Sequence, residues 1–384
     1  MKNLAIFSPN LGAISESFIK RHMQELLPGR SVIVAGSDKP PYCGHWDVDA
    51  PKFMLPELDG QLNLDRKKKL YKVALGMVGI KQRSNFLYNS ALQGFLKDHN
   101  VSVLLGEYLD VSTTIIDLAS KLNIKLFAHA HGYDISVKLR EKFWRREYQN
   151  FNRTAGVITM SQYSKQLLID LGIKEHLIHI IPYGVYLPEA IKARQENATV
   201  KCLAVGRMVP KKAPVLLLEA FAKAAKENPK LTLDYVGSGE LFQSAVDYIK
   251  EHQLEDKVSL HKSLPNEEVH KRMLEADIFI QHSITCPLTG DQEGLPVAIL
   301  EAMAHGLPVV STRHAGIPES VSDTVSGFIV NEKDTSSMGQ KILELSKDKS
   351  LRETMGKEGR KIVEAKFTWE IEKKSLLKLI EANL

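Results

Sequence analysis

Two glutamates stand eight positions apart in the segment Glu293-Gly-Leu-Pro-Val-Ala-Ile-Leu-Glu301. Pro296 suits a first helical position, and Gly306 followed by Pro308 suits the end of a helix. The spacing predicts a helix of about nine residues, with Glu293 in the preceding loop and Glu301 in the second turn. A helix N-terminus binds anions, because it offers free N–H groups and a positive dipole end. Carboxylates on both sides of it fit a phosphorylated ligand that carries hydroxyls; an acidic loop before a buried helix is the structural alternative.

A second group of candidate residues is basic. In Val205-Gly-Arg-Met-Val-Pro-Lys-Lys-Ala213, a strand is predicted to end at Val205 and a helix to begin near Pro214. Arg207 and Lys212 then lie on a loop at the carboxyl end of a strand. Arginine offers a fork of donors and lysine a point charge, so the two could neutralise a diphosphate. A merely solvated basic loop remains the alternative.

Two loops with glycines also follow predicted strands. Gly237 and Gly239, in Val236-Gly-Ser-Gly-Glu240, could let the backbone approach a ligand closely. Gly12, in the loop Ser8–Glu16, could do the same for a phosphate. Tight turns explain these glycines equally well, and the third glycine of the dinucleotide fingerprint is missing, which disfavours a dehydrogenase.

The segment His129-Ala-His-Gly-Tyr-Asp134 follows another predicted strand. We expect His131 and Asp134 to face a cleft and to hydrogen-bond a substrate rather than a metal ion. Histidines whose hydrogen bonds are satisfied within the fold are the structural alternative. Asp47-Val-Asp49 matches a cation-binding pattern, but it follows Gly-His-Trp instead of an apolar strand and is interpreted as a loop. No metal site is expected.

Short apolar runs alternate with helical patterns along the chain, which indicates parallel sheets covered on both faces. The predicted strands are Leu4–Phe7, Ser31–Ala35, Val101–Leu105, Lys125–Ala128, Val157–Met160, Ile178–Ile181, Cys202–Val205, Thr232–Val236, Val258–Leu260, Ile278–Gln281, Val309–Ser311 and Phe328–Val330. The predicted helices include Ser15–Leu27, Val111–Leu122, Pro214–Glu227, Leu241–Glu251 and Thr335–Leu345.

A polar segment without strand signal, Tyr186–Ala198, is the best linker candidate. The fold expected is therefore α/β, with two Rossmann-like domains, residues 1–190 and 199–366, and a ligand cleft between them. The last helical stretch, within residues 367–384, is expected to pack back on the first domain.

Composition sets the broad class. A chain of 384 residues exceeds the usual size of one core, and 43% hydrophobic with 25% charged residues is ordinary for a soluble globular protein. The widely spaced Cys43, Cys202 and Cys286 suggest a reducing compartment. The chain has no run of about 20 apolar residues. The net charge of +5 does not demand nucleic acid, and a cytoplasmic location is expected.

Residues 65–83 hold seven basic residues and one acidic one, with Leu70, Val73, Ala74 and Met77 on one helical face. This composition fits an amphipathic helix at an anionic membrane surface. A helix that packs on its own domain and exposes a solvated basic face is the alternative.

Taken together, the motifs resemble the retaining GT-B glycosyltransferases of family 4. The motifs that carry the resemblance, in chain order, are His131-Gly-Tyr-Asp134, Ile181-Pro-Tyr-Gly-Val185, Gly206-Arg207 with Lys212, Val236-Gly-Ser-Gly-Glu240, Glu293 to Glu301 and Gly316-Ile-Pro-Glu319. The segment Cys286–Gly294 further resembles transferases of bacterial exopolysaccharide assembly, of the colanic acid and amylovoran type. The chain departs from the pattern at Ala213, where glycine is common, and in the short loop around Gly12.

The resemblance implies a role for each site residue. Glu293 would contact the donor sugar and stabilise positive charge at its anomeric carbon, and Glu301 would bind the ribose hydroxyls. Arg207 and Lys212 would hold the diphosphate. The remaining donor contacts implied are His131 to the sugar, Leu264 to the base, and the backbone at Gly294, Leu295, Val297, Gly237, Gly239 and Gly12.

The function expected is transfer of a hexosyl-type sugar from a nucleoside diphosphate sugar to a sugar acceptor, with retained configuration and without a cofactor or metal ion. One version has a lipid-linked acceptor and peripheral membrane contact through residues 65–83. Another has a soluble small-molecule acceptor. A non-catalytic nucleotide-sugar-binding or scaffold protein on the same fold is the alternative from a different class.

Overall fold

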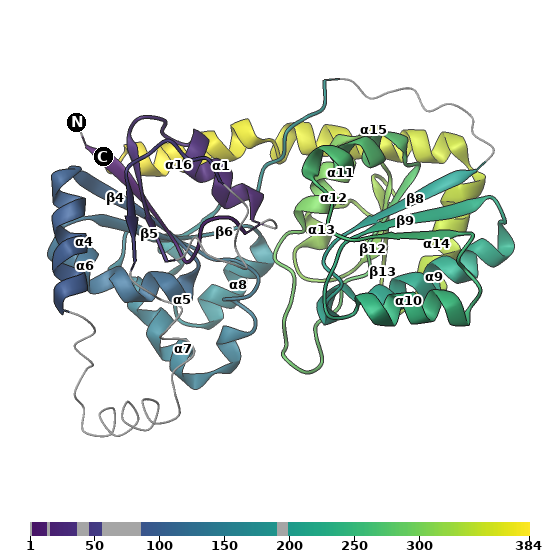
Figure 1. The fold of residues 1–384 in the computed structure, drawn as a ribbon, viewed down its shortest axis with the longest axis horizontal. Coiled ribbons are helices and arrows are strands. Elements are labelled where there is room, and N and C mark those ends of the chain that lie inside the picture. The colour runs from purple at the N-terminus through teal and green to yellow at the C-terminus, as the bar shows by residue number, and fades with distance from the viewer. Residues whose placement is uncertain (1, 14–15, 37–45, 56–85, 190–198) are drawn as a thin grey trace.

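The computed structural model describes residues 2–13, 16–36, 46–55, 86–189 and 199–384. They form two α/β domains, each built on a fully parallel sheet with helices on both faces (Figure 1). The predicted fold class is confirmed. Residues 190–198 of the predicted linker Tyr186–Ala198 lie outside the described residues, as does the basic segment 65–83. In the part of the chain that is described, no helix has the length and apolar character needed to cross a membrane.

The first sheet has seven strands in the order β3-β2-β1-β4-β5-β6-β7. The strands are β1 (Asn3–Ser8), β2 (Ser31–Ala35), β3 (Lys52–Met54), β4 (Val101–Glu107), β5 (Lys125–His129), β6 (Gly156–Thr159) and β7 (Ile178–Ile180). The helices of this part are α1 (Ser17–Glu25), α4 (Phe86–Asp98), α5 (Leu109–Ser112), α6 (Ile116–Lys121), α7 (Lys142–Glu147) and α8 (Gln162–Asp170).

The second sheet has six strands in the order β10-β9-β8-β11-β12-β13. The strands are β8 (Val200–Val205), β9 (Leu231–Val236), β10 (Val258–His261), β11 (Ile278–Ile280), β12 (Val309–Thr312) and β13 (Gly327–Val330). The helices that follow β8 along the chain are α9 (Pro214–Glu227), α10 (Phe242–Glu251), α11 (Asn266–Glu275), α12 (Val297–Ala304), α13 (Ile317–Ser320), α14 (Thr335–Lys347), α15 (Lys349–Lys366) and α16 (Trp369–Glu381).

The central strands are buried, which explains why they read as apolar runs. In β1 every residue after Asn3 is buried, and Leu4 pairs with Ser31 of β2 and with Val103 of β4. The apolar core of the first domain continues through Ile299 of α12 and Val363 of α15, so the two domains share packed surface. Because all strands of a parallel sheet point the same way, the loops after them gather at one edge.

Two predictions about elements were wrong. Strand β3 was missed, because it is a short edge strand with two of its three residues exposed and has no apolar run. The single helix predicted over Val111–Leu122 is instead α5, a 3-10 turn and α6. The hydroxyls of Thr113 and Thr114 donate to backbone oxygens three residues earlier, both at 2.7 Å, a local alternative to regular helix.

Helix α16 lies along the first domain after the chain crosses back from the second, as Figure 1 shows in yellow. The crossing is held by backbone hydrogen bonds from Val185 N–H to Phe367 O (2.8 Å) and from Trp369 N–H to Val185 O (3.1 Å). Trp369 and Ile380 are buried by this packing.

Candidate active site

Helix α12 separates the two glutamates as predicted. It spans eight residues and starts at Val297, with Pro296 at the N-cap, one position later than expected. Glu293 lies in the loop before it, and Glu301 lies in its second turn. Within the described residues, the backbone N–H groups of Gly294, Leu295 and Val297 donate no hydrogen bond. These groups are therefore available to an anion.

Glu293 is paired with a lysine from another loop of the second domain. Its Oε2 lies 3.2 Å from Lys212 Nζ, with side chains only 10% and 12% exposed. Burial alone would raise the pKa of Glu293, but the ammonium groups of Lys212 and Lys211 outweigh it and lower the pKa to about 2. The other oxygen, Oε1, is buried without a hydrogen-bond partner among the described residues. Glu293 is thus ionised and has one oxygen free to accept a hydroxyl.

A histidine that sequence reasoning missed supports this loop. The N–H of Glu293 donates to His314 Nε2 at 3.0 Å. Since Nε2 accepts, Nδ1 carries the hydrogen, and it lies 2.6 Å from Glu332 Oε1. The position of His314 just before the Gly316-Ile-Pro-Glu319 motif is the signal that could have found it.

The two adjacent lysines have different jobs. Lys211 Nζ donates to Asp291 Oδ1 at 3.0 Å and to the backbone oxygen of Gln292 at 3.1 Å, so it fixes the loop that leads to Glu293. Lys212 instead faces Glu293 itself. Burial lowers the pKa of Lys212, and the Glu293 carboxylate opposes that shift. Arg207, on the same loop, is exposed.

Gly237 and Gly239 are required by packing between loops. A side-chain carbon at Gly237 would collide with the backbone oxygen of Gly206, and one at Gly239 with that of Met208. Hydrogen bonds join the same loops, from Met208 N–H to Ser238 O at 2.9 Å. The glycine turn therefore braces the backbone that carries Arg207.

Glu301 has a different environment from Glu293. It is half-buried, and burial raises its pKa to about 7, although the charge of Arg21 from the first domain opposes the shift. No described side chain forms a salt bridge with Glu301. A hydroxyl that donates a hydrogen bond to Glu301 would stabilise the ionised form of this carboxyl group, which burial disfavours.

His131 and Asp134 lie deeper than predicted. Asp134 is fully buried and accepts from the N–H groups of Leu109 and His131, both at 2.6 Å, so the expectation that it faces the cleft was wrong. His131 is 4% exposed, with Nδ1 2.5 Å from Tyr183 Oη and Nε2 3.0 Å from Glu107 Oε2. Both ring nitrogens are therefore occupied here. Burial lowers the pKa of His131 to about 4, so the ring is neutral.

The loop that begins at His131 contacts the loop of Glu293 in the second domain. A side-chain carbon at Gly132 would lie 2.9 Å from the backbone nitrogen of Gly294 and 3.0 Å from Gln292 O. Beside this contact, the carboxylate of Glu319 accepts from the N–H groups of Gln162 and Tyr163 at 2.8 and 2.9 Å, and so caps α8 across the domain boundary. The loops that carry His131 and Glu293, one from each domain, thus meet.

Two segments of the sequence match models of known protein families. Residues 188–362 match the model described as "Glycosyl transferases group 1", and residues 67–187 match "Glycosyltransferase Family 4". The two matches together span residues 67–362 of the 384 residues. The chain belongs to the glycosyltransferases of group 1 and family 4. The resemblance to glycosyltransferases inferred from the motifs is confirmed, while retained configuration and hexosyl transfer stay predictions.

Two relatives of this glycosyltransferase come from exopolysaccharide synthesis. It is 28% identical over 360 residues to the amylovoran biosynthesis glycosyltransferase AmsK of Erwinia amylovora, covering 93% of this chain and 80% of AmsK. It is 31% identical over 258 residues to WcaL of Escherichia coli (strain K12), named for colanic acid biosynthesis, covering 66% of this chain and 63% of WcaL.

Two solved structures show the same fold. Anabaena HepE, in complex with UDP, has a TM-score of 0.77 at 17% identity over the whole of both chains. Sucrose-phosphate synthase from Thermosynechococcus elongatus has a TM-score of 0.75 at 18% identity, covering 100% of this chain and 99% of that one. The GT-B fold is therefore shown.

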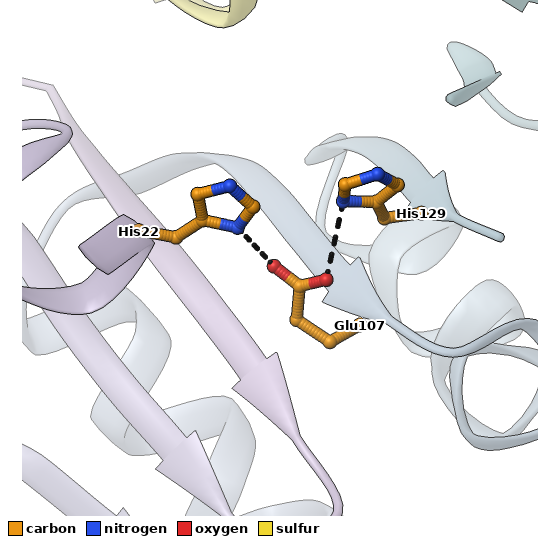
Figure 2. A group of neighbouring side chains, drawn as sticks. All are labelled: His22, Glu107 and His129. Atoms are coloured by element: carbon orange, nitrogen blue, oxygen red, sulfur yellow. Dashed lines mark hydrogen bonds and ion pairs between the residues drawn. The ribbon is translucent and has the colours of Figure 1, made fainter. Parts of the chain in front are cut away.

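One buried cluster in the first domain of the glycosyltransferase could in principle hold a metal ion. The ligand atoms of His22, Glu107 and His129 lie within 4.8 Å of one another (Figure 2). Both nitrogens of His22 are, however, hydrogen-bonded to carboxylates, of Glu107 at 2.7 Å and of Glu372 at 3.1 Å. His129 Nδ1 lies 3.2 Å from Glu107 Oε2 without hydrogen-bond geometry. The described contacts make this a hydrogen-bonded cluster around one carboxylate.

The other predicted residues lie as follows. Leu264 follows β10 and is partly buried against the core, and Gly12 follows β1 with a φ of +105°, which a glycine adopts without strain. Asp47 and Asp49 are exposed in an irregular segment, as predicted. A cavity of about 470 Å³ lies at the opposite edge of the first sheet, near Asn123 and Asn383, and shares no residue with the site.

Proposed function

We propose that this glycosyltransferase moves a sugar from a nucleoside diphosphate sugar to a sugar acceptor, with retained configuration, in bacterial polysaccharide synthesis. The observation that carries the proposal is the Glu293–Lys212 pair, 3.2 Å apart, beside the unoccupied N–H groups before α12. A carboxylate, an ammonium and a helix end at one point match a donor that has hydroxyls, a diphosphate and a developing positive charge.

In the proposed mechanism the protein orients the reactants and stabilises charge. The bond between the anomeric carbon and the phosphate oxygen breaks, and the acceptor oxygen bonds to the anomeric carbon from the same face. The leaving phosphate oxygen takes the proton of the acceptor hydroxyl. Arg207 and Lys212 neutralise the charge that develops on the diphosphate, and ionised Glu293 stabilises the anomeric carbon. No protein nucleophile or metal ion is assigned a step.

The proposed donor is a nucleotide sugar, which Glu301 would hold through the ribose hydroxyls. Anabaena HepE, solved with UDP and with UDP-glucose, supports this class of donor. The role of His131 is proposed as a contact with the donor sugar through its loop, because its two ring nitrogens already have partners.

The proposed acceptor is a sugar in an exopolysaccharide intermediate, by analogy with AmsK and WcaL. The lipid-linked version places the enzyme at the inner face of the cell membrane through residues 65–83, and the alternative version uses a soluble acceptor in the cytoplasm. Co-sedimentation with anionic vesicles separates them, because only the lipid-linked version predicts binding that is lost when the basic residues of 65–83 are replaced by glutamine.

A panel of UDP-, GDP- and ADP-sugars tests the proposal, with thermal stabilisation and donor hydrolysis measured in parallel. A ligand that binds the folded state raises its apparent stability. We expect one base to raise the Tm and to be hydrolysed slowly without acceptor. If no nucleotide sugar shifts the Tm or is turned over, the proposed donor class is wrong.

Two variants test the division of work between the glutamates. Glu301→Ala should weaken nucleotide binding, and Glu293→Ala should mainly reduce transfer while nucleotide affinity stays within a few-fold of wild type. Equal loss of nucleotide binding in both variants would contradict this division.

A further inference from the structure

The chain crosses between the two domains twice, once after β7 and once before α16. Both crossings contact the same buried cluster beside the site. The first crossing leaves β7 and carries Tyr183 and Gly184, and the second enters α16 and carries Glu372. The crossings are packed backbone to backbone, since a side-chain carbon at Gly184 would collide with the backbone oxygen of Thr368. Glu372 also accepts from the N–H of Gly184 at 2.8 Å. The two crossings are therefore packed and hydrogen-bonded to each other.

A series of contacts between charged groups leads from the second crossing into the core of the first domain. Glu372 Oε1 lies 3.1 Å from His22 Nε2, and His22 Nδ1 lies 2.7 Å from Glu107 Oε1. A carboxylate only accepts, so both nitrogens of His22 carry hydrogen and the ring is an imidazolium. Burial lowers the pKa of His22, but the two carboxylates outweigh it and raise the pKa to about 9.

The last residue in this series of contacts is His131. Glu107 Oε2 lies 3.0 Å from His131 Nε2, which must donate, so in the neutral ring Nδ1 accepts from the hydroxyl of Tyr183. The ring is thus held from both crossings, by Tyr183 directly and by Glu372 through His22 and Glu107. The next residue, Gly132, is the one that fits against Gly294.

We propose that Glu372 and His22 are positioning residues for sugar transfer. Together they hold the His131–Gly132 loop against the Glu293–Gly294 loop, and they link it to α16, the helix that returns from the second domain. The inference rests on the proposed function for its kinetic consequence. Neither residue touches the site itself. Among the described residues, three titratable groups face His22, namely Glu372 from α16, Glu107 from β4 and His129 from β5. The ring centroids of His22 and His129 are 5.6 Å apart. Arg21, on the same helix as His22, lies 4.0 Å from Glu372.

Glu372→Gln tests the proposal, with Glu370→Gln as the matched control, an exposed glutamate on the same helix. We expect Glu372→Gln to lower kcat at least tenfold while the KM for the nucleotide sugar stays within about threefold. Loss of one carboxylate lowers the pKa of His22, so the alkaline fall of kcat should begin at lower pH than in wild type. Glu372→Asp should restore part of kcat, and Glu370→Gln should behave as wild type.

A lower Tm with unchanged kcat and an unmoved pH profile would overturn the proposal, since it would make Glu372 a stabilising residue only. A second readout does not depend on turnover. The amides of His131 and Ile135 are hydrogen-bonded within the loop, and their hydrogen exchange should speed up in Glu372→Gln. If wild type turns over no nucleotide sugar, the proposed function fails, while unchanged exchange at these amides would overturn the positioning inference by itself.

Discussion

Lys212 Nζ and Glu293 Oε2 lie 3.2 Å apart, each nearly buried, on two different loops of the second domain. The pairing holds the carboxylate ionised and leaves its second oxygen without a partner. An ion pair with an unused acceptor is costly to bury for structure alone, because each lone pair left without a donor costs free energy. The arrangement is better explained by a ligand that supplies the missing hydroxyl.

Exchanging each of the two adjacent lysines should separate structure from activity. Lys211→Met removes the ammonium group that pairs with Asp291 and should lower the free energy of unfolding by about 1–3 kcal/mol, and the Tm with it. Lys212→Met should reduce kcat by about 10²- to 10³-fold, the usual effect of removing one stabilising charge. Thermal unfolding and turnover of both variants check this; a larger activity loss in Lys211→Met than in Lys212→Met would contradict it.

The pKa of Glu301 predicts a pH dependence of nucleotide binding. In the unfolded chain the carboxyl titrates near 4.5 and in the folded protein near 7, so the cost of ionising it appears as pH rises from 4.5 and is complete above 7. Ribose hydroxyls that donate to the carboxylate favour the ionised form. Binding of the nucleoside diphosphate should therefore tighten about three- to tenfold between pH 6 and 8 and release a proton near pH 6.5.

Calorimetry in buffers of different ionisation enthalpy measures that proton directly. The phosphate of the nucleotide titrates in the same range, so Glu301→Gln serves as the control. The pH dependence attributable to Glu301 is the part that disappears in this variant. An unchanged proton release in Glu301→Gln would show that Glu301 does not contact the ribose.

Gly132 offers a test of the contact between the two domains. Gly132→Ala would place a carbon 2.9 Å from the nitrogen of Gly294, so one of the two loops must move. We expect kcat/KM to fall at least tenfold with a small change in Tm. Gly94→Ala is the control, because Gly94 has open space around it within helix α4, where alanine stabilises by about 1 kcal/mol. Full activity of Gly132→Ala would mean that this contact is dispensable.

The backbone conformation of Ala213 fits a position at which glycine is common in the family. It adopts a left-handed conformation, with φ of +39° and ψ of +56°, directly between Lys212 and helix α9. A residue with a side chain is strained there by about 1–2 kcal/mol, while glycine is not. Ala213→Gly should therefore raise the unfolding free energy by up to about 1 kcal/mol after its larger entropy loss is counted. Denaturant unfolding checks the sign, and a lower stability would contradict the strain.

Much of the fold followed from the sequence, because the buried strands are short apolar runs and the helix α12 has clear start and stop residues. The edge strand β3 carries Lys52 and Met54 on its exposed side and has no such signal. The break inside 111–122 depends on hydroxyls of Thr113 and Thr114 that bond locally, which an apolar pattern does not reveal.

The candidate residues could be predicted where they follow a strand, as for Arg207 and Lys212, or flank a helix with clear start and stop residues, as for Glu293. The buried network was not, because its members come from distant segments that only the fold brings together. Each nevertheless leaves a trace, since His22 and Glu372 occupy buried positions on amphipathic helices, and Glu107 ends an apolar strand. Charged residues on an apolar stripe are the signal for such a network.

The most direct test of the account is transfer itself, measured with the nucleotide sugar that stabilises the wild-type protein and a sugar acceptor, in wild type and in Glu293→Gln. We predict that proton NMR of the wild-type product shows the anomeric configuration of the donor, and that Glu293→Gln binds the nucleoside diphosphate within about threefold of wild type but turns over at least 100-fold more slowly. Inverted configuration in the product, or full turnover by Glu293→Gln, would contradict the central claim.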